Sequence, residues 1–155
     1  MSTSTPEAGI ERLRRRGWTL CTAESLTAGL VAASAANVAG CSDVLRGGVV
    51  AYHEAIKATV LELDSTILSQ GVVSRAVAEA MAVSARRLLQ ADVAISTTGV
   101  AGPEPHGGEP VGSVWIAVAT PERIEGEHLS LHGDRGDIRR QTVNACWELL
   151  ERVLG

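Results

Sequence analysis

Three short apolar segments, separated by stretches with helical periodicity, constrain the fold of this chain more than any other feature. The segments TLCTA, GGVVAYH and DVAISTT span residues 19–23, 47–53 and 92–98, and each is typical of a buried strand. Helices between successive strands favour parallel pairing through crossover connections. Two further strands, at 111–119 and 124–132, flank the turn TPER and predict an antiparallel hairpin. We therefore expect an α/β fold: a three-layer α/β/α sandwich with a mixed, mostly parallel sheet of about five strands.

Residues that favour helix starts and stops place the helices around these strands. Thr5 and Pro6 predict the cap and first turn of a helix that ends before Gly17. Asp64 and Ser74 predict the N-caps of two later helices. The expected helices span about 6–16, 26–38, 54–62, 65–70, 74–90 and 134–154.

The length of 155 residues fits a single domain covering residues 1–155. Hydrophobic residues make up 45% of the chain and charged residues 21%, which is typical of a soluble globular protein. The longest apolar runs, such as VWIAVA at 114–119, are too short to span a bilayer, so we expect no membrane partner. The first residues contain no apolar signal core, and we expect a cytoplasmic protein.

Charge and composition also exclude several classes of function. A net charge of −4 and only four aromatic residues argue against a general nucleic-acid binder. The arginines at 12 and 14–16 are interpreted as a solvated face of the first helix. Three cysteines without CxxC spacing indicate free thiols, and the four histidines are scattered. The sequence therefore predicts neither a metal site nor a cofactor.

The stretch TAESLTAG, at 22–29, follows the first predicted strand and has two interpretations. Ser25 is either the N-cap of the next helix or a nucleophile held near that helix's N-terminus. In open α/β sheets, ligands bind beyond the carboxyl ends of parallel strands. Polar residues follow all three predicted strands and should meet at that edge: Glu24, Ser25 and Thr27, then Tyr52 and Lys57, then Thr98 and the glycine-rich loop 99–110.

Ser25, Lys57 and Tyr52 together form a plausible constellation for acyl transfer, in which a neutral amine accepts the hydroxyl proton. An ordinary lysine has a pKa of about 10.4 and is charged at pH 7, so desolvation would have to lower that pKa, with possible help from Arg135. Backbone N–H groups at the start of the second helix would stabilise the oxyanion. Cys146 is a rival nucleophile, although its place on a core-facing helix side favours packing.

Four motifs in the same order resemble the CinA C-terminal-domain family, whose members include nicotinamide mononucleotide deamidases. They are TAESLTAG, GGVVAYHEAIK, STTGVAGP with PVGSVW behind it, and GDRGDIRRQT, and the similarity runs from about Ile10 to Leu154. The resemblance implies an anticodon-binding-domain-like α/β/α fold, a homodimer, and no metal. It also implies a mononucleotide substrate, hydrolysed at its carboxamide to nicotinate mononucleotide and ammonia.

The resemblance also implies roles for individual residues. The nucleophile falls on Ser25, the tyrosine on Tyr52, the lysine on Lys57 and the hydroxyl residue before the loop on Thr98. The substrate-binding residues that we expect are Glu24, Thr27, Gly29, Gly99, Ala101, Gly102 and Arg135. Arg135 suits a phosphate or a structural ion pair about equally well.

Departures from the family pattern concern the substrate more than the chemistry. Leu26 and Ala28 stand where the family commonly has Cys and Gly, and YHEAIK stands where it often has YSNEAK. His53 and Glu54 are therefore candidates for altered substrate contacts. The alternative function is a non-catalytic, nucleotide-binding sensor or interaction domain on the same scaffold, because a fold does not fix a function.

Overall fold

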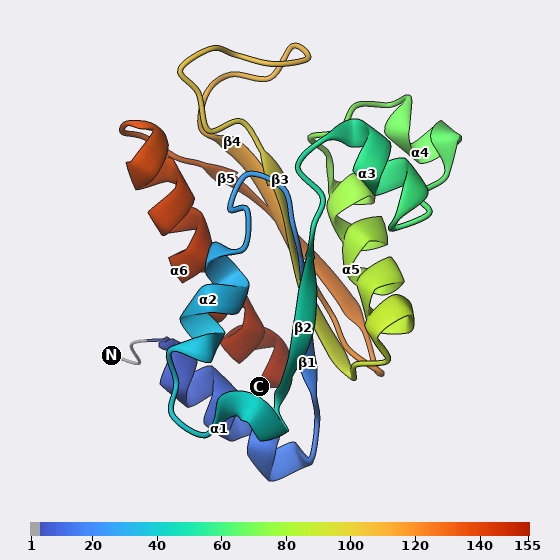
Figure 1. Ribbon diagram of the computed structural model, residues 1–155. Coiled ribbons are helices and arrows are strands. Elements are labelled where there is room, and N and C mark those ends of the chain that lie inside the picture. The colour runs from blue at the N-terminus through green and yellow to red at the C-terminus, as the bar shows by residue number, and fades with distance from the viewer. Residues whose placement is uncertain (1–3) are drawn as a thin grey trace.

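A five-stranded mixed sheet forms the centre of the computed structural model, which describes residues 4–155 (Figure 1). The strands are β1 (Leu20–Glu24), β2 (Leu45–Val50), β3 (Val93–Gly99), β4 (Ser113–Ala119) and β5 (Ile124–Ser130), in the order β2-β1-β3-β4-β5. β1 pairs in parallel with β2 and β3, whereas β4 is antiparallel to both β3 and β5. The predicted mixed sheet and its final hairpin are confirmed.

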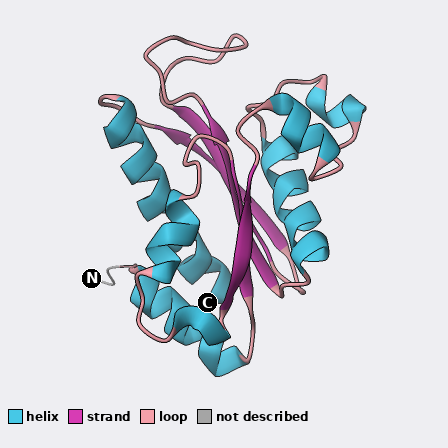
Figure 2. Cartoon of the chain, viewed as in Figure 1, coloured by secondary structure: helices cyan, strands magenta, loops and turns pink. Residues whose placement is uncertain are grey.

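Helices cover both faces of the sheet, as Figure 2 also shows. They are α1 (Pro6–Arg16), α2 (Leu30–Ala36), α3 (Glu54–Thr59), α4 (Ser65–Leu68), α5 (Arg75–Leu89) and α6 (Arg135–Leu154), with a short 3₁₀ turn η1 (Cys41–Asp43). α1, α2 and α6 lie on one face, and α3, α4 and α5 lie on the other (Figure 1). None of the helices within residues 4–155 is both long enough and apolar enough to cross a membrane.

Alternation along the strands gives each face its own apolar cluster. Ile95 of β3 belongs to the cluster under α1, α2 and α6, whereas the neighbouring Ala94 belongs to the cluster under α5. α1 packs closely on α6 through Gly9, where a Cβ would lie 2.8 Å from the Trp147 ring. Trp147 Nε1 donates to Ser34 Oγ at 2.9 Å and so joins α6 to α2.

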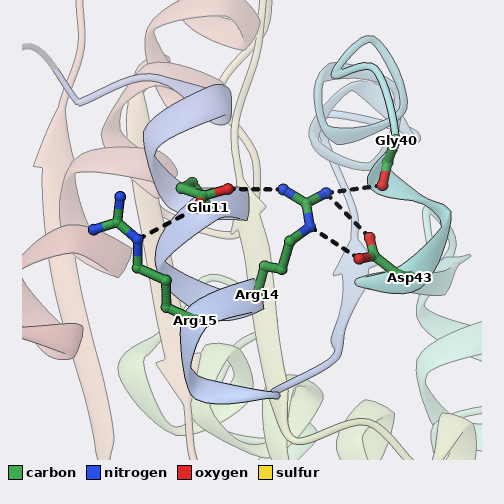
Figure 3. A network of polar contacts seen from close by, with 5 residues as sticks. All are labelled: Glu11, Arg14, Arg15, Gly40 and Asp43. Carbon is green, nitrogen blue, oxygen red and sulfur yellow. Dashed lines mark hydrogen bonds and ion pairs between the residues drawn. The ribbon is translucent and has the colours of Figure 1, made fainter.

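The first helix is anchored by ion pairs along its outer side (Figure 3). Arg14 donates to Glu11, to both carboxylate oxygens of Asp43 and to the Gly40 carbonyl, which connects α1 to η1. Arg15 donates to Glu11 at 3.2 Å. Arg16 lies over the Trp18 ring at 5.2 Å. These arginine side chains are therefore engaged within the molecule.

The predicted start of α2 is wrong, and the difference matters for the site. The helix begins at Leu30 instead of about Leu26, because Ala28 and Gly29 adopt left-handed backbone conformations with φ of 48° and 100°. Such angles cannot continue a right-handed helix. Residues 25–29 instead form a turn whose last residue, Gly29, is the N-cap. Ser25 is therefore not the cap of this helix.

Other boundaries differ by smaller amounts. β2 begins at Leu45 and ends at Val50, and α3 ends at Thr59. The predicted caps are confirmed: Thr5, Asp64 and Ser74 each accept a hydrogen bond from a backbone N–H in the first turn of their helices. α6 begins with a capping box formed by Asp134 and Asp137.

Candidate active site

A cavity of about 400 Å³ opens beyond the carboxyl ends of β1, β2 and β3. The loop between β3 and β4 extends past the same end of the sheet (Figure 1). The cavity is lined by Ser25, Leu26, Tyr52, His53, Glu54, Lys57, Val72, Val73, Thr98, Gly99, Val100, Ala101, Gly102, Glu104, His106 and Arg135. Its size lies within the range of small-molecule sites, and its lining combines apolar walls with a few polar groups.

Ser25 and Lys57 meet inside this cavity. The Lys57 Nζ lies 3.0 Å from Ser25 Oγ and donates to the Ala51 carbonyl at 2.8 Å. Only 8% of Ser25 and 2% of Lys57 is exposed. His53 caps α3 through Nδ1, and Lys57, in the last turn, is the buried residue of this short helix. A hydroxyl and an amine at hydrogen-bond distance can exchange a proton.

Burial makes Lys57 a weaker base than an exposed lysine, but it increases the fraction of the amine that is neutral at pH 7. Desolvation lowers the pKa of Lys57 from its ordinary 10.5 to about 8, because a charged amine loses its water in the cavity. The carboxylate of Glu54 acts in the opposite direction and raises this pKa. Arg135 is not among the groups that alter it. The predicted desolvation of Lys57 is thus present, and the suggested help from Arg135 is not.

The backbone of Ser25 is held by β3. The Ser25 N–H donates to the Thr97 carbonyl at 3.0 Å and approaches Thr97 Oγ1 at 3.2 Å. The hydroxyls of Thr27 and Thr97 lie 2.8 Å apart, and both residues are fully buried. Thr27 therefore holds the turn against β3 through this buried contact and does not line the cavity. Thr97 is a supporting residue that the sequence pattern did not single out.

Glu24 is buried behind the site, where it organises the helix that follows. Its carboxylate accepts from the N–H groups of Val31 and Ala32, at 2.8 and 3.0 Å, and from the Thr22 hydroxyl at 3.0 Å. These are first-turn N–H groups of α2, so the carboxylate takes the place of a capping side chain. Glu24 and Gly29, which the resemblance assigns to substrate binding, are absent from the cavity lining.

Tyr52 and Arg135 lie together at the rim. The Arg135 guanidinium donates to the Tyr52 hydroxyl and to the Gly102 carbonyl, and so connects the start of α6 with two loops. Tyr52 is 54% exposed. No hydrogen bond within residues 4–155 joins it to Ser25 or Lys57. The structure therefore places Tyr52 beside the arginine, apart from the serine and lysine pair.

The β3–β4 loop forms the opposite wall. Gly99, Ala101 and Gly102, which the resemblance assigns to substrate binding, all line the cavity. At Gly99 a Cβ would lie 2.6 Å from a Val114 methyl carbon, so only glycine allows this close strand approach. Thr98 also lines the cavity, but its hydroxyl donates to the Val72 carbonyl at 2.7 Å. That bond ties β3 to the segment before α5.

Two of the cysteines are buried away from the cavity. Cys146 and Cys21 are fully buried in the two apolar clusters. Burial raises the pKa of the Cys146 thiol well above its ordinary value and that of Cys21 to about 12, so both remain protonated at neutral pH. Neither lines the cavity. In the part of the chain from residue 4 onward, no group of three or more His, Cys, Asp or Glu side chains is arranged to hold a metal ion.

Comparison with known proteins identifies what this arrangement is similar to. A protein of Geobacillus kaustophilus, provisionally named a competence-damage inducible protein, is 43% identical over 147 residues, which cover 93% of this chain. The chain spans about a third of the length of such relatives, 36% in this case.

Solved structures of similar size share the fold. A CinA superfamily protein from Klebsiella pneumoniae has a TM-score of 0.92 at 32% identity, over 99% of this chain and 98% of that one. A competence/damage inducible protein from Agrobacterium tumefaciens has a TM-score of 0.89 at 30% identity, over the full length of both chains. The family model of the CinA C-terminal domain matches residues 2–154. The chain therefore belongs to the CinA C-terminal domain family.

Proposed function

We propose that this protein is an amidohydrolase that converts nicotinamide mononucleotide to nicotinate mononucleotide and ammonia. The observation that carries this proposal is the buried contact of 3.0 Å between Lys57 Nζ and Ser25 Oγ, in a cavity at the carboxyl edge of the sheet. A lysine with a pKa near 8 is neutral in about a tenth of the molecules at pH 7. Such an amine can act as a general base.

The first half of the reaction forms an ester on the serine. In the neutral amine, one N–H donates to the Ala51 carbonyl, and the lone pair is free to accept the proton of the Ser25 hydroxyl, 3.0 Å away. Ser25 Oγ attacks the carboxamide carbon while its proton passes to Lys57 Nζ, and the carbonyl oxygen becomes an oxyanion. When this intermediate collapses, the carbon–nitrogen bond breaks and Lys57 returns the proton to the departing nitrogen, which leaves as ammonia.

The second half regenerates the enzyme. Water attacks the ester carbon while Lys57 again accepts a proton, and the proton then passes to Ser25 Oγ as the nicotinate carboxyl group leaves. Each turnover consumes one amide and one water and yields one carboxylic acid and one ammonia. The same serine and lysine pair performs both halves, so no further titrating residue is required.

The rim offers a site for the phosphate of such a substrate. Arg135 is exposed and donates to two neutral oxygens, those of Tyr52 and Gly102, within hydrogen-bond reach. A phosphate would form stronger, charge-assisted hydrogen bonds with this guanidinium than either neutral acceptor does. Apolar residues of the lining, such as Val72 and Val100, suit the face of a pyridine ring.

Ammonia release from nicotinamide mononucleotide tests the proposal directly. We expect turnover by the wild-type protein and a loss of at least about 10⁴-fold in kcat for Ser25→Ala, by analogy with other serine nucleophiles. Ser34→Ala is a matched control, because Ser34 is a partly buried serine on α2 that is bonded to Trp147 and lies outside the cavity. Full activity in Ser25→Ala would exclude the serine mechanism. Binding of the mononucleotide without any turnover would favour the nucleotide sensor.

A further inference from the structure

Arg139 lies on α6 one turn after Arg135, and it contacts the turn that carries Ser25. Its Nε donates to the Leu26 carbonyl at 2.9 Å, and its Nη2 donates to the Thr27 carbonyl at 3.3 Å. Among the ion pairs formed by residues 4–155, none includes Arg139. Its positive charge is therefore directed at two backbone carbonyls.

One of these carbonyls begins a short series of hydrogen-bonded peptide groups. The Thr27 carbonyl shares its peptide group with the N–H of Ala28, which donates to the Ser25 carbonyl at 3.1 Å. The Ser25 carbonyl in turn shares its peptide group with the N–H of Leu26. Because consecutive hydrogen bonds polarise one another, the guanidinium increases the donor strength of each N–H along this series. The last donor is the N–H of Leu26.

The Leu26 N–H belongs to the residue directly after the nucleophile, and no acceptor occupies it within residues 4–155. Leu26 also lines the cavity. The N–H groups at the start of α2, which the sequence favoured as oxyanion donors, are unsuitable, because those of Val31 and Ala32 donate to Glu24.

We propose that the Leu26 N–H stabilises the oxyanion formed at Ser25, and that Arg139 is a positioning residue that orients and polarises this N–H. The inference rests on the proposed function in that it requires Ser25 to form a tetrahedral adduct. As Oγ bonds to the substrate carbon, the π electrons of the carbonyl move onto its oxygen. The hydrogen bond from the Leu26 N–H is strongest when the carbonyl oxygen carries this negative charge, so loss of that bond lowers kcat more than it changes KM.

The first test compares Arg139→Gln with Arg140→Gln. Both changes remove one positive charge from the same helix, but Arg140 is exposed and pairs with Asp137. With nicotinamide mononucleotide, we expect kcat of Arg139→Gln to fall between about tenfold and about a hundredfold, which is less than the 10²- to 10³-fold loss that follows deletion of a direct donor. KM should change by less than about twofold, and Arg140→Gln should match the wild type.

Arg139→Lys separates orientation from folding. A lysine keeps the charge but cannot donate to both carbonyls in the fixed geometry of a guanidinium. We expect it to recover part of the kcat lost in Arg139→Gln and to melt close to the wild-type temperature. If kcat is unchanged and only KM or the melting temperature responds, Arg139 has a structural role alone and the inference is wrong.

The second test does not depend on the proposed substrate. In 3-pyridineboronic acid the boron accepts a lone pair from Ser25 Oγ, the proton passes to Lys57, and the resulting tetrahedral boronate mimics the intermediate. We expect Arg139→Gln to weaken this binding by about the same factor as kcat, with Arg140→Gln unaffected. Calorimetry gives the affinity, and a tetrahedral ¹¹B NMR signal reports the adduct.

The two tests together distinguish this inference from the proposed function. Boronate binding that depends on Arg139, without ammonia release, would support the oxyanion site and reject nicotinamide mononucleotide as the substrate. Ammonia release with equal kcat in wild type and Arg139→Gln would reject only the role of Arg139. A wild-type protein that neither binds the boronate nor releases ammonia would overturn both.

Discussion

Replacing Lys57 by methionine should change the stability of the protein in a way that depends on pH. Lys57 is 2% exposed, and burial lowers its pKa from 10.5 to about 8. The difference between these two values corresponds to about 3 kcal/mol of free energy. Below about pH 8 the amine is protonated in both the folded and the unfolded protein, and the folded state carries this whole cost. Above about pH 10.5 both states are neutral and the cost has gone.

The sign of the effect follows from proton binding. Between pH 8 and 10.5 the unfolded chain binds more protons at Lys57 than the folded protein does, so this residue makes the free energy of unfolding rise with pH. Methionine removes that dependence, but it leaves the Ala51 carbonyl without its donor, at a cost of about 1–2 kcal/mol. Lys57→Met should therefore be more stable than the wild type at pH 7 by about 1–2 kcal/mol, and less stable near pH 11 by a similar amount.

Urea unfolding followed by tryptophan fluorescence measures this difference at pH 7, 8, 9, 10 and 11. Because Lys57 is the only lysine of the chain, ¹³C-labelled lysine also gives one side-chain NMR signal, whose titration reads the pKa directly. We expect a midpoint near 8. A midpoint near 10.5, together with a stability difference between variant and wild type that is constant across this pH range, would refute the reasoning and remove Lys57 as the base.

Three further predictions concern the surroundings of the pair. Glu54→Gln removes the carboxylate that raises the pKa of Lys57, so the alkaline rise of kcat/KM with pH should move to lower pH; an unchanged profile would contradict this coupling. Glu24→Ala leaves two first-turn N–H groups of α2 without an acceptor and should lower the free energy of unfolding by about 2–4 kcal/mol, with a smaller loss for Glu24→Gln, as measured by urea unfolding. Gly112→Ala would place a Cβ 1.9 Å from the Leu131 carbonyl oxygen at φ of 91° and should cost about 3 kcal/mol or more, so a thermal melt within 2 °C of wild type would be inconsistent with this geometry.

The sheet and the meeting of Ser25 with Lys57 could be predicted from the sequence because both depend on local patterns. Strand segments such as 92–98 are rich in β-branched residues, and the polar residues that follow parallel strands meet where those strands end. The contact of Ser25 with Lys57 was expected on this basis together with the family resemblance, although the two residues are 32 positions apart. The desolvation of Lys57 was expected because a lysine can act as a base at neutral pH only if its pKa is lowered.

The turn after β1 could not be predicted in the same way. Leu26 and Ala28 are good helix formers by themselves, and the residue type at position 28 does not indicate the left-handed conformation that Ala28 adopts. The roles of Glu24 and Arg139 depend on hydrogen bonds to backbone atoms, those of Glu24 in the next helix and those of Arg139 in a turn more than 100 residues away. Side-chain spacing in the sequence does not indicate such bonds. The position of Tyr52 beside Arg135 likewise depends on how the two loops meet. The homodimer stays a prediction.

Positive charge in this molecule is divided between one interior amine and many guanidinium groups. Lys57 is the only lysine, and apart from the histidines all other basic side chains are arginines. One of them, Arg14, forms an ion pair with Asp43 at the surface. Guanidinium groups keep their proton beyond pH 12, whereas burial lowers the pKa of Lys57 to about 8. Mildly alkaline buffer should therefore remove the charge beside Ser25 while the external ion pairs stay intact.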